Sequence, residues 1–270
     1  MTLPLVIEAT ELNLQLENPD LLIVDLSSEE NYLKGHIPGA IHLPATRLLS
    51  GKAPIPNKLP DLDQLQQLCR DIGLNSSSQV VVYDDQMGPW AGRLIWSLNI
   101  LGHENCSFLN GQLNAWTQAG FATETTANTP EQSDITVNLE QNLVADVSSI
   151  IEQLQQDGSI IWDARSPEEY SGEKVINAQK GGHIPGAVNL EWTDCLISTE
   201  DTRLKPAAEL KALLESKGIT PEKSVITHCQ THRRSGLTYL IAKYLGFNDI
   251  RCYDGSWFEW GNLPDTPVEK

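Results

Sequence analysis

The chain has 270 residues, a hydrophobic content of 40% and a formal net charge of −17 at pH 7. This length fits one large domain or two domains of ordinary size, each able to bury a core. The negative charge repels nucleic acids and anionic membranes at long range, so we expect neither as a partner.

The N-terminus begins MTLPLVIEATEL and lacks the basic and apolar regions of a signal peptide. No apolar run reaches the roughly 18–20 residues of a membrane span. The cysteines form an odd set without a CxxC pair, namely Cys69, Cys106, Cys195, Cys229 and Cys252. This spacing argues against a disulfide framework or a zinc site, so we expect a cytoplasmic protein without metal or cofactor.

The second half of the chain repeats motifs of the first half in the same order. The hexapeptide GHIPGA stands at residues 35–40 and again at 182–187. Likewise, NGQLNAW at 110–116 has a counterpart in DGSWFEW at 254–260. The shared order indicates a tandem duplication.

The segment between the two copies is rich in Thr, Asn, Gln and Glu and poor in large apolar residues. Such a composition is typical of a linker. We therefore predict a first domain at residues 1–122, a linker at 123–142 and a second domain at 143–270.

Short apolar runs alternate with helical patterns along each half. The helical patterns at 60–73 and 206–218 both end at a Gly placed as a C-cap. The predicted buried strands lie at 21–26, 80–84, 106–110, 159–164, 224–229 and 250–254. This alternation predicts an α/β fold with two tandem domains, each a mainly parallel β-sheet flanked by helices. In such folds a ligand binds at the carboxyl ends of the strands.

The two copies differ most after the second of these strands in each half. Aligned on Gly92 and Gly236, the two loops place Asp85 opposite Cys229. The second copy also carries His232 and two Arg where the first has Gly, Pro and Trp. Features found in only one copy are candidates for chemistry. We therefore predict that the second domain carries the nucleophile and the first lacks it.

The Cys229 loop joins an apolar strand to a helix predicted to begin near Ser235. Backbone N–H groups and the helix dipole at such a junction favour an anion. Together with His232, Arg233 and Arg234 they are expected to lower the thiol pKa from about 8.5 to between roughly 3.5 and 7.5. The thiolate is the nucleophilic form, and Arg side chains suit sulfonate or phosphate oxygens. The loop thus predicts a reactive cysteine that accepts an anionic substrate.

Four segments together resemble the rhodanese family over nearly the whole chain. They are CQTHRRSG from Cys229, the repeated GHIPGA, DARSPEEYSG from Asp163 and YDGSWFEW near the C-terminus. The closest resemblance is to bacterial enzymes with two tandem rhodanese domains. It implies that Cys229 takes the outer sulfur of thiosulfate as a persulfide, releases sulfite and passes the sulfur to a thiol, a protein or cyanide.

The resemblance also implies a set of site residues. The loop backbone from Gln230 through Thr231, His232 and Arg233 to Arg234 would cradle the persulfide, and its basic side chains would bind the sulfonate. Arg165, for which the first half has Ser27, is either a further substrate-binding residue or a salt-bridge partner.

Two features depart from the family's best-known members. The vertebrate-type thiosulfate enzymes have Cys-Arg-Lys-Gly-Val-Thr in the loop and the mercaptopyruvate enzymes have Cys-Gly-Ser-Gly-Val-Thr, whereas this loop matches neither. The vertebrate-type enzymes also have an Arg at the position of Glu169, so its substrate role does not carry over. The second domain contains an insert, SGEKVINAQKGG at 171–182, that either edges the site or forms a surface loop.

Several other functions stay open. The protein could be a mercaptopyruvate sulfurtransferase or a persulfide carrier within the same chemistry. A related phosphatase would need Cys-x5-Arg, but Ser235 stands at that position. A binding module without turnover is the remaining alternative, and the complete Cys229 loop argues against it. We expect a monomer, because two similar halves can pack on each other.

Overall fold

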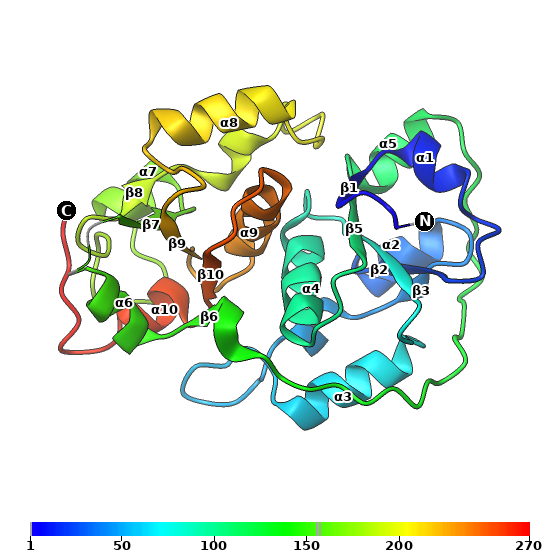
Figure 1. Cartoon of the computed structure of the whole chain (residues 1–270), viewed down its shortest axis with the longest axis horizontal. Helices are drawn as coiled ribbons and strands as arrows, with labels where there is room; N and C mark the ends of the chain where they lie inside the picture. Colours follow the sequence, from blue (N-terminus) through cyan, green and yellow to red (C-terminus); the bar gives the residue numbers. More distant parts are fainter. Residues whose placement is uncertain (1, 155, 157) are drawn as a thin grey trace. The chain divides into compact units, whose positions relative to one another are not determined.

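The computed structural model describes residues 2–154, 156 and 158–270 (Figure 1). The chain divides into two compact units. Unit 1 comprises Met1–Ser50, Leu59–Glu140 and Ser198–Leu204. Unit 2 comprises Gly51–Lys58, Gln141–Ile197 and Lys205–Lys270. None of the helices formed by the described residues combines the length and apolar character that a membrane crossing requires.

Unit 1 is built on a five-stranded parallel sheet in the order β1-β5-β4-β2-β3. Its strands are β1 (Val6–Ile7), β2 (Leu21–Asp25), β3 (Ile41–His42), β4 (Gln79–Tyr83) and β5 (Cys106–Leu109). Its helices are α1 (Ala9–Asn13), α2 (Glu29–Lys34), α3 (Leu62–Asp71), α4 (Pro89–Ile100) and α5 (Gln112–Gln118), with a 3₁₀ turn η1 (Ala45–Leu48).

Unit 2 has a parallel sheet of the corresponding order, β6-β10-β9-β7-β8. Its strands are β6 (Val144–Ala145), β7 (Ser159–Asp163), β8 (Val188–Asn189), β9 (Ser224–His228) and β10 (Ile250–Tyr253). Its helices are α6 (Val147–Gln153), α7 (Pro167–Ser171), α8 (Ala207–Ser216), α9 (Arg234–Tyr244) and α10 (Ser256–Trp260), with 3₁₀ turns η2 (Gln141–Leu143) and η3 (Trp192–Cys195). The matching topologies confirm the predicted fold class.

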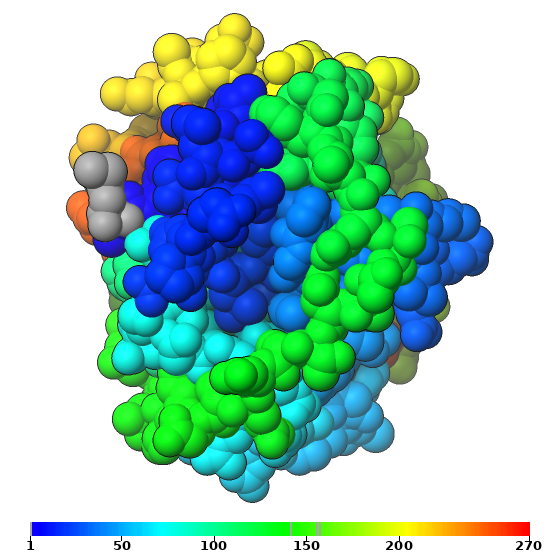
Figure 2. All heavy atoms as spheres, turned by 90° about the vertical axis from the view of Figure 1, so that its right-hand side faces the viewer, coloured from blue at the N-terminus to red at the C-terminus, as the bar shows by residue number. Residues whose placement is uncertain are grey.

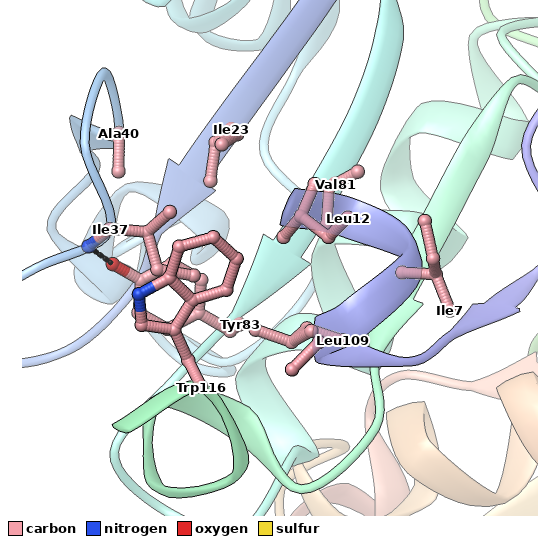
Figure 3. Close-up of a cluster of buried hydrophobic side chains, with 10 residues drawn as sticks. Ile7, Leu12, Ile23, Ile37, Ala40, Val81, Tyr83, Leu109 and Trp116 are labelled. Carbon is pink, nitrogen blue, oxygen red and sulfur yellow. Dashed lines mark hydrogen bonds between the residues drawn. The ribbon is translucent and has the colours of Figure 1, made fainter. Parts of the chain in front are cut away.

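The core of unit 1 shows how the sheet is covered (Figure 3). Val81 and Tyr83 of β4 share one face of the sheet, because side chains alternate along a strand. They pack there with Leu12 of α1 and Trp116 of α5. The Tyr83 hydroxyl also accepts a hydrogen bond from the Ile37 N–H at 3.1 Å. Full burial of each large side chain contributes roughly 1.5–3 kcal/mol, so this cluster fixes the helices on the sheet.

The predicted linker residues 123–140 group with unit 1. Figure 2 shows this green segment crossing the surface of the unit. The Asn128 N–H donates to the Tyr32 hydroxyl at 3.0 Å, and the Val137 N–H donates to the Gln66 side chain at 3.0 Å. These hydrogen bonds hold the segment against the unit.

Both copies of GHIPGA brace a loop in the same way. The His36 ring stacks on Tyr32 with 3.7 Å between ring centroids, and His183 stacks on Tyr170 at the same distance. Each His also forms an isolated antiparallel bridge, with Glu124 in unit 1 and with Glu269 in unit 2. The repetition of the motif is therefore explained by structure.

Candidate active site at Cys229

Cys229 is the first residue after β9, and α9 begins five residues later at Arg234. Val225 and Ile226 are fully buried and anchor the strand in the core. His232 has a positive φ of 52°, which allows the loop to turn back toward the start of α9. The thiol is 1% exposed and lies at the carboxyl edge of the sheet. The site is therefore where a parallel α/β sheet binds its ligands.

The environment of the Cys229 sulfur favours the thiolate. Burial is the largest single influence and would raise its pKa, but several contacts together lower the pKa below its ordinary value, the Arg234 guanidinium first among them. The Ser235 hydroxyl, 3.5 Å from Sγ, and the backbone N–H groups of Ser235 and Thr231 act in the same direction. By contrast, burial raises the pKa of Cys69 to about 12. The contacts of the Cys229 loop therefore lower the thiol pKa, whereas burial raises the pKa of Cys69.

The turn after β10 forms hydrogen bonds to the Cys229 loop. The Cys229 N–H donates to the Ser256 hydroxyl at 3.4 Å. The Trp257 N–H donates to the Cys229 carbonyl at 3.0 Å, and the Phe258 N–H donates to the Gln230 carbonyl at 2.9 Å. The duplicated Asn-Gly and Asp-Gly motifs mark this turn, so the repeat has a bracing role beside the loop.

Arg234 is held between the thiol and a buried carboxylate. Its two terminal nitrogens donate to the Glu169 oxygens at 2.6 and 2.9 Å, and Glu169 is 3% exposed. Ser166 caps α7 and fixes Glu169 in its first turn. Burial would raise the pKa of Glu169, but Arg234 lowers it below the ordinary value. The sequence identified Glu169 only as a departure, and its pairing with Arg234 was not foreseen.

Gln230 and His232 make internal contacts. His232 is fully buried, and its Nδ1 lies 2.7 Å from the Ser235 hydroxyl. The Gln230 amide donates to the carbonyl of Ile176 in the insert at 2.5 Å. Of the two alternatives for the insert, the structure therefore shows that it borders the Cys229 loop. Ser235 was missed as a site residue, although its place at the Cys-x5 position was the available signal.

Thr231 is partly exposed and Arg233 is exposed. The loop thus brings Gln230, Thr231, His232, Arg233 and Arg234 around Cys229. Their contact with a substrate stays a prediction.

Arg165 is 1% exposed and forms the ion pair that the sequence left open. Its guanidinium donates to both carboxylate oxygens of Asp163 and to the Gly182 carbonyl at 2.8 Å. It also lies 4.3 Å from the centroid of the Trp257 ring. His228 Nε2 is 3.6 Å from the same carboxylate. Arg165 is therefore part of a buried network beneath the loop.

The structure corrects the predicted alignment of the two loops. Asp25 pairs with Tyr83, and Asp163 pairs with His228, so the residue after each strand is Asp84 or Cys229. Asp85 was the wrong counterpart of Cys229. The prediction aligned the two copies on Gly92 and Gly236 and so assumed that the helices containing them are equally long. In the structure α4 has 12 residues and α9 has 11.

The Asp84 carboxylate occupies the loop of unit 1 as an anion would. It accepts backbone N–H hydrogen bonds of 2.7–2.9 Å from Gln86, Gly88, Trp90 and Ala91, two on each oxygen. A loop of this shape thus offers several inward N–H donors. Among the described residues, no group of His, Cys, Asp and Glu side chains could hold a metal ion.

Comparisons with known proteins agree with this geometry. Residues 8–119 and 146–263 match the family described as rhodanese-like domain. Thiosulfate sulfurtransferases from Azotobacter vinelandii and Pseudomonas aeruginosa are 45% and 44% identical, each covering 99% of this chain, which spans 98% and 97% of those proteins. A solved 3-mercaptopyruvate sulfotransferase structure from Escherichia coli has a TM-score of 0.85 and 26% identity, covering 94% of this chain and 99% of that one. The chain belongs to the rhodanese family and contains two rhodanese-like domains in tandem.

Proposed function

We propose that this protein is a thiosulfate sulfurtransferase that carries the transferred sulfur as a persulfide on Cys229. The observation that carries the proposal is the buried thiol whose pKa is lowered by Arg234, Ser235 and loop N–H groups. The thiosulfate sulfurtransferases at 45% and 44% identity support thiosulfate as the donor.

The reaction consists of two sulfur transfers with no net oxidation or reduction. The Cys229 thiolate attacks the outer sulfur of thiosulfate, and the S–S bond of the donor breaks. Its electron pair leaves with sulfite, and a persulfide remains on Cys229. An acceptor thiolate or cyanide then attacks the terminal sulfur, and the Cys229 thiolate is the leaving group.

The loop residues stabilise the negative charges of the donor and of the persulfide. Arg234 and the exposed Arg233 attract an anionic donor that the net charge of −17 would otherwise repel. The backbone from Gln230 to Arg234 cradles the persulfide. The carboxylate of Asp84 in the corresponding loop of unit 1 supports this role, because it accepts four backbone N–H groups there.

Arg165 acts indirectly in this proposal. Its guanidinium is already bonded to Asp163 and to a carbonyl, and it is almost fully buried. We assign it the support of the turn at Trp257, against whose ring it lies. The donor is then bound by the loop and not by Arg165.

A thiocyanate assay with thiosulfate and cyanide tests the proposal. We expect the wild type to turn over and Cys229→Ala to lose activity completely. Cys252→Ala, a change at another buried cysteine of unit 2, serves as the matched control and should retain activity. Activity in Cys229→Ala, or its absence in the folded wild type with thiosulfate, would refute the proposal.

Mercaptopyruvate is the second candidate donor, favoured by the likeness to the Escherichia coli enzyme structure. The thiosulfate sulfurtransferases are more similar to this chain, at 45% and 44% identity against 26% for that enzyme. We therefore expect a higher kcat/KM with thiosulfate than with mercaptopyruvate, measured in the same assay.

We further propose that the protein works as a monomer in the cytoplasm. The five cysteines are all buried and none is in a disulfide, which suits a reducing compartment. Gel filtration at several concentrations tests the monomer, and a concentration-dependent shift toward twice the mass would contradict it.

A further inference from the structure

Unit 1 contains a pocket of about 470 Å³ at the carboxyl edge of its sheet. Its walls come from the end of β2, from α2, from the loop after β4 and from α5. The lining residues used below are Ser27, Asn31, Tyr83, Asp85, Met87 and Leu113. The volume is in the range of small-molecule sites, roughly 300–1,000 Å³.

The pocket exists because two large side chains of unit 2 have small counterparts in unit 1. The Ser27 N–H bonds to Asp25 as the Arg165 N–H bonds to Asp163, so Ser27 and Arg165 correspond. In the same way, Leu113 and Trp257 each follow a residue of positive φ at the start of a helix.

In unit 2 the Arg165 guanidinium lies 4.3 Å from the Trp257 ring centroid, and each residue is 1% exposed. Ser27 and Leu113 cannot fill the same volume. The space that structural side chains occupy in unit 2 is thus open in unit 1.

The loop of unit 1 is closed to an anion. The buried Asp84 carboxylate already takes the N–H groups of Gln86, Gly88, Trp90 and Ala91. Any anionic ligand would meet this carboxylate and the neighbouring Asp85.

The charge on the pocket wall favours a cation. Asp85 Oδ2 accepts hydrogen bonds from the Ser28 N–H at 3.0 Å and from the Asn31 amide at 2.7 Å, which fixes the carboxylate. Its Oδ1 has no such partner among the described residues. Lys34 is the only cationic side chain among the described lining residues, and its ammonium is paired with Glu30 at 2.6 Å.

We propose that this pocket binds a small organic molecule with one ammonium group and an apolar body. The ammonium would pair with Asp85, and the body would contact Met87, Leu113 and the Tyr83 side of the pocket. A charge-assisted hydrogen bond to the Asp85 carboxylate, which Ser28 and Asn31 already hold in place, gives the specificity for an ammonium group. The apolar walls give contact area. This site is separate from Cys229 and does not depend on the sulfur-transfer proposal.

Calorimetric titration of the full-length protein at low salt tests the site with three probes of similar shape. They are 2-phenylethylammonium, 2-phenylethanol and 3-phenylpropionate. We expect the ammonium to bind with a Kd on the order of 1 mM, at least tenfold tighter than the alcohol, and the carboxylate not to bind. Equal binding of ammonium and alcohol, or no binding of the ammonium up to about 10 mM, would overturn the proposal.

Variants locate the binding. Asp85→Asn keeps the shape and an acceptor oxygen, and it should remove the preference for ammonium. Leu113→Trp introduces the side chain found in unit 2 and should abolish binding. Cys229→Ala should bind as the wild type does. Native-state hydrogen exchange of β2 and β4 reports that unit 1 is folded in each unit-1 variant. Unchanged ammonium binding in either of them places the ligand elsewhere and refutes the site.

Discussion

At the residue scale, we propose that Arg234 contributes most to the reactivity of Cys229. Arg234 is the largest influence that lowers the thiol pKa against the cost of burial. Arg234→Ala should therefore raise this pKa, and the thiolate fraction at neutral pH should fall. We expect alkylation by iodoacetamide and persulfide formation to slow by up to roughly tenfold per pKa unit, because the thiolate fraction falls by that factor. The pH dependence of the alkylation rate measures this directly, and an unshifted midpoint in the variant would show that Arg234 does not activate the thiol.

Glu169 acts through Arg234, because both carboxylate oxygens accept from that guanidinium. Glu169→Ala removes the support, and we expect kcat/KM for thiosulfate to fall roughly tenfold through the misplaced cation. The double variant with Arg234→Ala should be no slower than Arg234→Ala alone. Independent, additive losses in this double-mutant cycle would instead mean that Glu169 serves only the fold.

At the element scale, the buried network beneath the Cys229 loop stabilises the sheet edge of unit 2. Asp163→Asn would leave the Arg165 guanidinium buried without its counter-charge, at a cost of about 3–5 kcal/mol. The matched change in unit 1 is Asp25→Asn, where Ser27 carries no charge, and we expect about 1–3 kcal/mol there. Native-state hydrogen exchange of β7 and β9 against β2 and β4 reports each unit separately. Equal losses in the two units would contradict a special role for the charged network.

The same network gives a pH dependence of stability. Burial would raise the pKa of Asp163, but His228 and Arg165 hold it below the ordinary value. The unfolded chain then binds more protons than the folded unit between the two pKa values. This contribution is complete above the unfolded value of about 3.9 and is lost as the pH falls through the lower folded pKa. The opening free energy of β7 and β9, obtained from hydrogen exchange corrected for the intrinsic rate at each pH, should therefore fall more with acid in the wild type than in Asp163→Asn.

The longer helices and strands could be predicted from the sequence, because each contains enough buried apolar residues to show a helical or strand pattern. The runs at 159–164 and 224–229 became β7 and β9 within one residue at each end. The two-residue strands β1 and β3 could not be predicted, since two residues carry no period and pair only once the sheet exists.

The site itself was only partly predictable for a similar reason. Cys229 and its basic loop are local in sequence and were found. The partners Glu169, Ser256 and Ile176 come from distant segments, and only folding brings them to the loop. Asp85 was wrongly aligned with Cys229 for the same reason, because the strand register that identifies Asp84 as the counterpart is a tertiary feature.

At the scale of the whole molecule, a duplication has left two units with one topology and different loops. Unit 2 fills its sheet edge with Arg165 and Trp257 and places a thiol in the loop. Unit 1 places the Asp84 carboxylate in the loop and leaves an open pocket. The duplicated features, such as the His36 and His183 loops, are those that the fold itself requires.

Cys229 is the residue that we propose to carry the transferred sulfur. The most direct test is the intact mass of the wild type and of Cys229→Ala before and after incubation with thiosulfate. We predict that the wild type gains the mass of one sulfur atom, that cyanide removes it, and that the variant gains nothing. A gain in the variant, or none in the folded wild type, would contradict the claim.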